Sequence, residues 1–136
     1  MKLSTLLLGA AAIGLLSTSF AMADDYLGGA VKSAEVGGKE ILTDSKGMTL
    51  YIWDKDAVGV SNCVDKCAVN WPPLWAAADT AVSGDWSLVD NAGAPAGMKV
   101  VAYKGWPLYL WIKDTKPGDT TGDGVGGTWH TAVEGM

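Results

Sequence analysis

Two aspartates in matching contexts are the first side chains of this chain that could carry chemistry. Asp56 and Asp114 each close a Tyr-x-Trp-x-x-Asp run, where a β-prone segment ends. Two carboxylates held roughly 5–10 Å apart form the catalytic pair of glycoside hydrolases. An aspartate at a strand end more simply accepts hydrogen bonds from the turn backbone that follows. A carbohydrate-active enzyme using Asp56 and Asp114 is therefore one hypothesis, and a structural role for both is the simpler interpretation.

Two cysteines, Cys63 and Cys67, are separated by three residues. A redox-active pair usually has two residues between its cysteines and a helix N-terminus or cation that activates one thiol. We predict a structural disulfide that pins a local turn, with a contribution at the low end of ~2–4 kcal/mol because the closed loop is short. A redox-responsive pair is the alternative. Haem attachment would need a histidine directly after the second cysteine, where the chain has Ala68.

His130 is the single histidine, and it follows Trp129 directly. A zinc site would need several His or Cys ligands, so we predict no zinc and no cofactor, and we interpret His130 as a half-exposed strand residue. The seven tryptophans are expected mainly in the core, because aromatic side chains bury large areas. Aromatic strips can also stack on a sugar, a quinone or a partner side chain. Trp71, Trp129 and His130 are therefore a candidate surface for a ligand or partner.

A loop rich in Gly, Asp and Thr is predicted over residues 115–128. Asp114, Asp119 and Asp123 in and beside it are weak candidates for calcium, which takes six to eight oxygen ligands. Their spacing does not match an EF-hand, and a loop held by aspartate turns explains the same residues.

The chain contains an internal duplication. Residues 47–53 align with residues 105–111, and Trp71 aligns with Trp129 at the same offset of 58 positions. Open arrays of repeats need three or more units, so two copies predict a pseudo-twofold globule. The motif residues of the two copies are Tyr51, Trp53, Asp56, Tyr109, Trp111 and Asp114.

Each copy is predicted to form a β-hairpin. Residues 40–43 lead through the turn residues 44–47 into the first motif, and residues 98–103 lead through Lys104-Gly105 into the second. Alternation along residues 50–53 places apolar side chains on both faces. Such a strand is expected between two packed layers.

One short helical turn is predicted at the cysteine pair, over residues 61–68. Ser61 is the expected N-cap, and the prolines after Trp71 end the helix. The predicted fold class is mainly β: a small single domain of antiparallel hairpins formed by duplication, with this one helical turn.

The N-terminus has the three parts of a secretory signal peptide. Lys2 precedes a short apolar run, and small residues lead to a cleavage site after Ala23. We predict a cleaved Sec-type signal over residues 1–23, an N-terminal extension or edge strand over 24–36, and a two-repeat β domain over 37–136. The repeats are placed at about 40–75 and 98–133. Asp24 follows the site where a lipoprotein would have Cys, so a periplasmic or secreted protein with no membrane span after cleavage is expected.

Charge excludes some partners. The formal net charge is −5, and the sequence contains no arginine. Arginine is the side chain best suited to bidentate contacts with phosphate, so we predict no nucleic-acid partner and no anionic membrane surface.

The motif residues also resemble those of a known family. The two Tyr-x-Trp-x-x-Asp runs, the stretch Ser61-x-Cys63-x-x-x-Cys67 that ends in Trp71-Pro72-Pro73, and the glycine-rich segment before Trp129 are similar to a bacterial family of predicted lipoproteins and secreted repeats. That family has a Tyr-x-aromatic-x-x-Asp motif and no assigned activity. Its members are often lipidated, and this chain departs from them in having no cysteine at the cleavage site. The resemblance implies architecture and export.

Three functions are compatible with these patterns. The preferred hypothesis is a non-catalytic binding or accessory module of the cell envelope, whose partner is an unknown envelope protein or a small ligand. The second is a small redox or electron-transfer accessory protein that uses Cys63 and Cys67. The third is the carbohydrate-active enzyme. The copies differ in segments 57–74 and 115–130, where specific function is expected.

Overall fold

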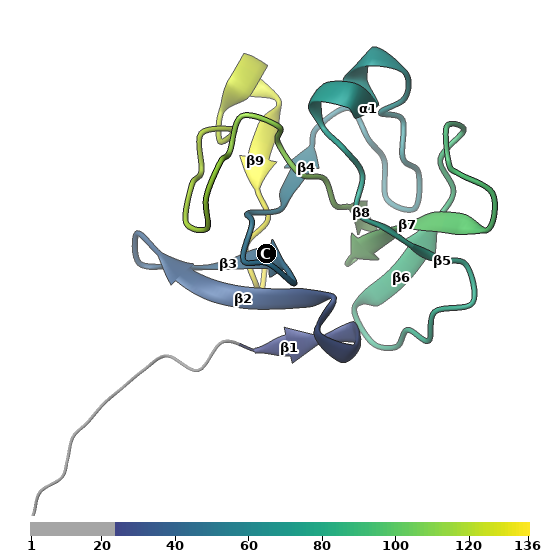
Figure 1. Cartoon of the computed structure of the whole chain (residues 1–136), viewed down its shortest axis with the longest axis horizontal. Helices are drawn as coiled ribbons and strands as arrows, with labels where there is room; N and C mark the ends of the chain where they lie inside the picture. The colour runs from purple at the N-terminus through teal and green to yellow at the C-terminus, as the bar shows by residue number, and fades with distance from the viewer. Residues whose placement is uncertain (1–23) are drawn as a thin grey trace, which may run out of the picture.

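The computed structural model describes residues 24–136, and the predicted signal peptide lies outside the described residues (Figure 1). Strands and loops make up nearly all of the described part, with one short α-helix, α1 (Lys66–Asn70), and two 3-10 turns, η1 (Leu27–Gly29) and η2 (Val125–Gly127). The predicted mainly β class with antiparallel pairing is confirmed. No helix within this part is long and apolar enough to cross a bilayer.

The first half of the molecule contains a three-stranded antiparallel sheet in the order β1-β2-β3. Its strands are β1 (Asp25–Tyr26), β2 (Val31–Val36) and β3 (Lys39–Asp44). Gly37 and Gly38 join β2 to β3 with φ of 60° and 83°, the left-handed conformations that a two-residue hairpin turn requires. The chain leaves β3 through a turn and folds back, so that the backbone N–H of Leu50 donates to the carbonyl of Leu42.

The second half repeats this arrangement around β7. Its strands are β5 (Trp75–Ala77), β6 (Trp86–Val89), β7 (Met98–Tyr103) and β8 (Trp106–Pro107), in the order β5-β7-β6 with β8 also on β7. Lys104 and Gly105 form the hairpin turn with φ of 51° and 86°. Leu108 then donates to the carbonyl of Val101, as Leu50 does to Leu42. The turn of the first copy is one residue longer, and otherwise the two hairpins correspond.

A short central pairing joins the halves. β4 (Tyr51–Trp53) pairs antiparallel with β9 (Trp129–Thr131). Tyr51 and Tyr109 face each other and exchange both backbone hydrogen bonds, at 2.8 and 3.0 Å. Since these tyrosines are equivalent in the two motifs, the pseudo-twofold axis passes between them.

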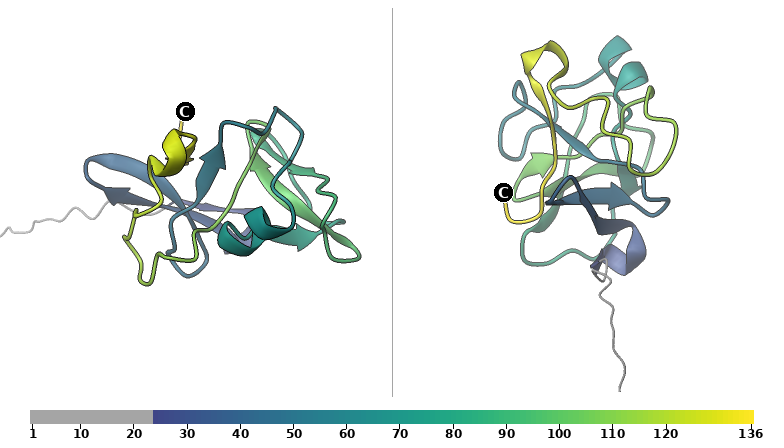
Figure 2. Two further views of the ribbon diagram at one scale, coloured as in Figure 1. Left: turned by 90° about the horizontal axis from the view of Figure 1, so that it is seen from above. Right: turned by 90° about the vertical axis from the view of Figure 1, so that its left-hand side faces the viewer.

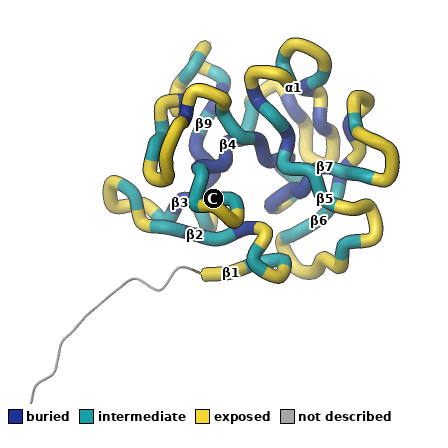
Figure 3. The backbone as a smooth tube through the Cα atoms, in the orientation of Figure 1, coloured by how far each residue is buried: buried dark blue, intermediate teal, exposed yellow. Residues whose placement is uncertain are grey.

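The two repeats exchange their closing strands. β5 follows the first motif but pairs with β7 of the second repeat, whereas β9 follows the second motif and pairs with β4 of the first. The two further views show the C-terminal segment returning to the first half of the chain (Figure 2). Buried residues concentrate where β3, β4 and β9 converge (Figure 3). Each half is therefore completed by a segment of the other.

The motif strands separate two apolar clusters. Leu50 and Leu108 are fully buried in one cluster with Leu42 and Val101. Tyr51 and Tyr109, one position further along, lie fully buried in a second, aromatic cluster. The alternation expected from the sequence is observed, because neighbouring side chains of an extended strand point to opposite faces.

The helix at the cysteines begins later than expected. α1 starts at Lys66, and its N-cap Asp65 has φ of 54° and makes no side-chain capping bond. The prediction that Ser61 caps this helix is wrong. Ser61 instead forms an isolated bridge with Asn91, from the other half of the chain.

Candidate functional site

Four indoles form one continuous stack in the aromatic cluster. Their order is Trp53, Trp129, Trp71 and Trp111, with successive ring centroids 5.1, 3.8 and 3.9 Å apart and interplanar angles of 9°, 3° and 24°. The inner two are each 5 % exposed, and the outer two are half-buried. Trp53 and Trp129 are also direct cross-strand partners of β4 and β9. The stack therefore has a covered centre and two accessible ends.

The stack obeys the pseudo-twofold symmetry of the fold. Trp53 corresponds to Trp111, and Trp71 corresponds to Trp129, so the order reads the same from either end. Because other indoles cover the ring faces of Trp71 and Trp129, no ligand can stack on them in this structure. We therefore do not retain the predicted ligand surface at these two residues, which build the core.

The motif tyrosines and aspartates bond across the repeats. The hydroxyl of Tyr51 donates to Oδ2 of Asp114 at 2.6 Å, and the hydroxyl of Tyr109 donates to Oδ2 of Asp56 at 2.7 Å. All four side chains are buried. Each motif thus supplies the phenol for one pair and the carboxylate for the other, so each hydrogen bond requires both copies.

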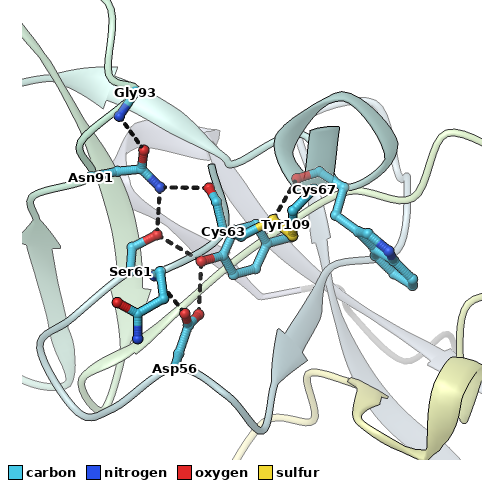
Figure 4. Close-up of a disulfide and its surroundings, with 9 residues drawn as sticks. Asp56, Ser61, Cys63, Cys67, Asn91, Gly93 and Tyr109 are labelled. Carbon is cyan, nitrogen blue, oxygen red and sulfur yellow. Dashed lines mark hydrogen bonds between the residues drawn. A yellow bond between two sulfur atoms is a disulfide. The ribbon is translucent and has the colours of Figure 1, made fainter. Parts of the chain in front are cut away.

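A chain of side-chain hydrogen bonds surrounds the pair formed by Tyr109 and Asp56 (Figure 4). Asn91 Nδ2 donates to Ser61 Oγ at 2.8 Å, and Ser61 Oγ lies 2.6 Å from the Tyr109 hydroxyl. Since the tyrosine proton goes to Asp56, the serine is the donor in that contact. The other oxygen of Asp56 accepts the backbone N–H of Asn62 at 2.7 Å.

Around the second pair, two backbone N–H groups and one hydroxyl of the loop take the place of those side chains. Gly122 N–H donates to the Tyr51 hydroxyl at 3.1 Å, and Thr121 donates to Asp114 Oδ1 from its N–H at 3.0 Å and its hydroxyl at 2.6 Å. A Cβ on Gly122 would lie 2.8 Å from the Tyr51 ring and 2.9 Å from the Trp71 ring. Only glycine fits at this position.

Burial sets the acid–base properties of this centre. It raises the pKa of Tyr51 and of Tyr109 well above the ordinary value, and the neighbouring carboxylates add to the rise. Burial also raises the pKa of Asp56, an effect opposed by the hydrogen bonds from Asn62 and Tyr109. Asp56 and Asp114 are 6 % and 7 % exposed, with both oxygens of each engaged by protein donors. Both carboxylates are covered by protein, so this geometry gives no support to the carbohydrate-active enzyme.

The predicted disulfide between Cys63 and Cys67 is confirmed. Cys63 is fully buried, and both sulfurs lie against the aromatic cluster. Cys63 Sγ lies 3.9 Å from the carbonyl oxygen of Trp71. A disulfide sulfur has no proton to donate, so this contact is packing.

The three calcium candidates hold separate parts of their loop. Asp114 bonds to Thr121, Asp119 accepts the backbone N–H groups of Thr115 and Lys116, and Asp123 accepts that of Thr131. These bonds hold the pKa of Asp119 below its usual range. Within residues 24–136, no three His, Cys, Asp or Glu side chains gather as metal ligands.

His130 lies at the rim of the centre rather than in it. Its Nε2 is 2.9 Å from Asp54 Oδ2, with the two side chains 43 % and 52 % exposed. This half-exposed position on β9 is the one expected from the sequence.

Three residues of the centre were not singled out as site residues by sequence reasoning: Ser61, Asn91 and Gly122. Asn91 reads as an ordinary turn residue, and nothing in its local context points to a partner 30 residues away. Gly122 is one of many glycines in its loop. This position requires glycine because two rings lie against it. Only one of these rings, that of Tyr51, belongs to a motif residue.

The fold and centre define a class: a β domain made of two copies that share strands and hydrogen bonds. The chain belongs to the family described as a secreted repeat of unknown function, whose model matches residues 31–75 and 92–133. Membership identifies an exported protein. No curated protein and no solved structure matches the chain.

Proposed function

We propose that this exported protein works in the periplasm as a non-catalytic binding module of the cell envelope. The polar groups of the repeated motif favour this over catalysis, because they are buried and engaged with one another. A binding function then needs a separate, accessible site.

The observation that carries the proposal is a hollow between the N-terminal strand and the loop before β6. Its volume is about 470 Å³, within the roughly 300–1,000 Å³ typical of small-molecule sites. Its lining residues are Asp25, Tyr26, Leu27, Ala81, Val82, Ser83 and Trp86. The ring centroids of Tyr26 and Trp86 lie 4.9 Å apart.

The chemistry of this lining suits a saccharide. A sugar ring has an apolar C–H face that packs on aromatic rings. Because Trp86 lies between the rings of Tyr26 and Tyr103, that contact would fall on the half-buried Tyr26. The sugar hydroxyls would bond to groups such as the Asp25 carboxylate and the Ser83 hydroxyl. The lining contains no Lys or His, which disfavours an anionic ligand. Envelope glycans supply neutral sugar units in the compartment that we propose.

Binding of neutral chito-oligosaccharides to residues 24–136 tests this function. The N-terminus should carry no tag, because β1 forms one wall. We expect a saturable change in tryptophan fluorescence and calorimetric binding, both lost in the double variant Asp25→Asn, Ser83→Ala. Asp79→Asn, which changes an exposed carboxylate outside the lining, is the matched control.

Several results would count against the proposal. Equal binding by the double variant would place the sugar elsewhere. Absence of binding across neutral glycans, with capture of an envelope protein that the double variant also captures, would replace the sugar by a protein partner and the hollow by another surface.

The position of the disulfide favours a second candidate, a redox accessory protein. The bond closes a short turn against the aromatic cluster, so its reduction would disturb the centre directly. Titration of the two thiols against defined redox buffers decides this. A bond that stays oxidised below about −300 mV is structural, and a higher potential would support the redox function.

A further inference from the structure

The indole stack and the two buried tyrosines form a single connected set of rings. Tyr51 meets Trp71 edge-on with centroids 5.4 Å apart, and Tyr109 meets Trp129 in the same way at 5.3 Å. Each inner indole therefore contacts another indole on both faces and a phenol at its edge. Orbital contact of this kind allows an electron to move from ring to ring.

We propose that this centre undergoes one-electron oxidation. An outer tryptophan loses an electron to an oxidant at the surface, and the resulting electron hole moves inward along the stack. A motif tyrosine is finally oxidised to a phenoxyl radical. The activity is separate from sugar binding, since it uses none of the residues of the hollow.

The outer indoles are the sites of oxidant contact. Trp53 and Trp111 are half-buried, whereas Trp71 and Trp129 are covered. A one-electron oxidant that cannot enter the protein, such as a radical or a metal complex of high potential, reaches only the two ends. Lys113 Nζ lies 5.6 Å from the Trp111 ring, and a cation near that ring disfavours a positive hole there. Trp53 is therefore the preferred site of oxidation.

The aspartates make the last step possible. An oxidised phenol is a very strong acid, so it is stable only when its proton has an acceptor. Asp114 Oδ2 lies 2.6 Å from the Tyr51 hydroxyl, and Asp56 Oδ2 lies 2.7 Å from that of Tyr109. The tyrosine gives its electron to the oxidised indole and its proton to the carboxylate. The indole is restored, the oxidant has gained one electron, and the products are a neutral phenoxyl radical and a carboxylic acid.

The remaining contacts hold each phenol in place for this transfer. Ser61 and the Gly122 N–H both direct hydrogen bonds at the phenol oxygens, so these oxygens keep a donor after their proton has left. Burial, which raises the pKa of Asp56, also makes its carboxylate a better proton acceptor.

Flash photolysis with a tris(bipyridine)ruthenium(III) oxidant, generated in the presence of residues 24–136, tests the proposal. We expect tryptophan radicals first, followed by neutral tyrosyl radicals in transient absorption and electron paramagnetic resonance, with a slower second step in D₂O. The double variant Asp56→Asn, Asp114→Asn should form tyrosyl radicals roughly a hundredfold more slowly, as expected when a positioned proton acceptor is lost.

Variants that keep the rings in place make the result decisive even if the aspartate variants unfold. Tyr51→Phe with Tyr109→Phe should abolish the tyrosyl signal of the centre and prolong the tryptophan radical, whereas Tyr103→Phe should change neither. Tryptophan radicals that decay in the wild type without a tyrosyl product would overturn the proposal. So would a tyrosyl yield in the double phenylalanine variant equal to that of the wild type, with Tyr26→Phe included in both proteins because Tyr26 also bonds to a carboxylate, that of Glu134, beside Trp86.

Discussion

The two tyrosine–aspartate pairs show one hydrogen bond kept in two different surroundings. Around Tyr109 and Asp56, side chains supply the next layer of hydrogen bonds. One of them, Asn91, comes from the other half of the chain. Around Tyr51 and Asp114, this layer consists of two backbone N–H groups and the Thr121 hydroxyl, all from the loop over residues 115–128. The bond between repeats is the common element. The loops around it differ, whereas the distance between the phenol oxygen and the carboxylate oxygen is 2.6 Å in one pair and 2.7 Å in the other.

The different surroundings of the two pairs predict that they tolerate substitutions unequally. A layer of side chains can exchange partners by rotating a hydroxyl or an amide. A layer of backbone groups is fixed by the path of the loop and by the absence of a side chain at Gly122. The second pair should therefore be the more sensitive of the two.

The largest effect is expected from Gly122→Ala. The added methyl group would lie below 3 Å from two buried rings, and overpacking of this kind costs up to about 3 kcal/mol. We expect a loss of that size in the free energy of unfolding, measured by urea denaturation. Gly93→Ala is the control beside the first pair, because its nearest neighbours lie at 3.4 and 4.0 Å. Equal losses in the two variants would contradict the comparison.

Substitution of the aspartates should also destabilise the second pair more than the first. In Asp114→Asn, one orientation of the amide points its Nδ2 at the Tyr51 hydroxyl, and the other points it at the Thr121 N–H. Either orientation leaves a buried donor without an acceptor, which costs about 1–3 kcal/mol. In Asp56→Asn, the Tyr109 proton can turn to Ser61 at 2.6 Å. Thermal unfolding of the two single variants should show the larger loss for Asp114→Asn, and the reverse order would remove the proposed difference.

The pH dependence of stability isolates the first pair. Burial raises the pKa of Asp56 in the folded state, so the folded chain holds more protons than the unfolded chain between the two pKa values. This contribution is fully present below the unfolded value of about 3.9 and is lost as the pH rises through the folded value. The free energy of unfolding of wild type minus that of Asp56→Asn should therefore fall with rising pH in this window. Denaturation curves in which the difference stays flat or rises would refute the assignment.

The smallest effect is expected outside both pairs. His130→Ala removes the exposed hydrogen bond with Asp54, and contacts of this kind between exposed side chains contribute roughly 0–1 kcal/mol. Chemical denaturation should show a change below about 0.5 kcal/mol. A larger loss would mean that the rim of β9 supports the centre.

Local patterns predict the elements of this fold, and they do not predict which elements meet. The alternation in residues 50–53, the turn at Lys104-Gly105 and the disulfide all depend on neighbours in sequence. The repeat shows that Tyr51 and Tyr109 occupy equivalent motif positions, but it does not show which residues contact each other in space. The cross-bonding of each tyrosine to the other repeat's aspartate therefore lies beyond local reasoning.

The errors have the same origin. Ser61 has the residue type and position of a helix cap, and long-range bonding to Asn91 and Tyr109 outweighs that local preference. Trp71 and Trp129 read as candidates for a surface because nothing in their segments shows that stacking covers both faces. Tertiary contacts decided each case.

The exchange of closing strands has a consequence for the time course of folding. β4 obtains its partner only when β9 is present, and Trp71 is covered only when Trp129 arrives. Contacts this distant in sequence slow the folding of small domains. When the chain becomes available from its N-terminus onward, we expect the aromatic centre to stay open until the segment with β9 has also become available. Closure of the molecule is then the final step of its folding.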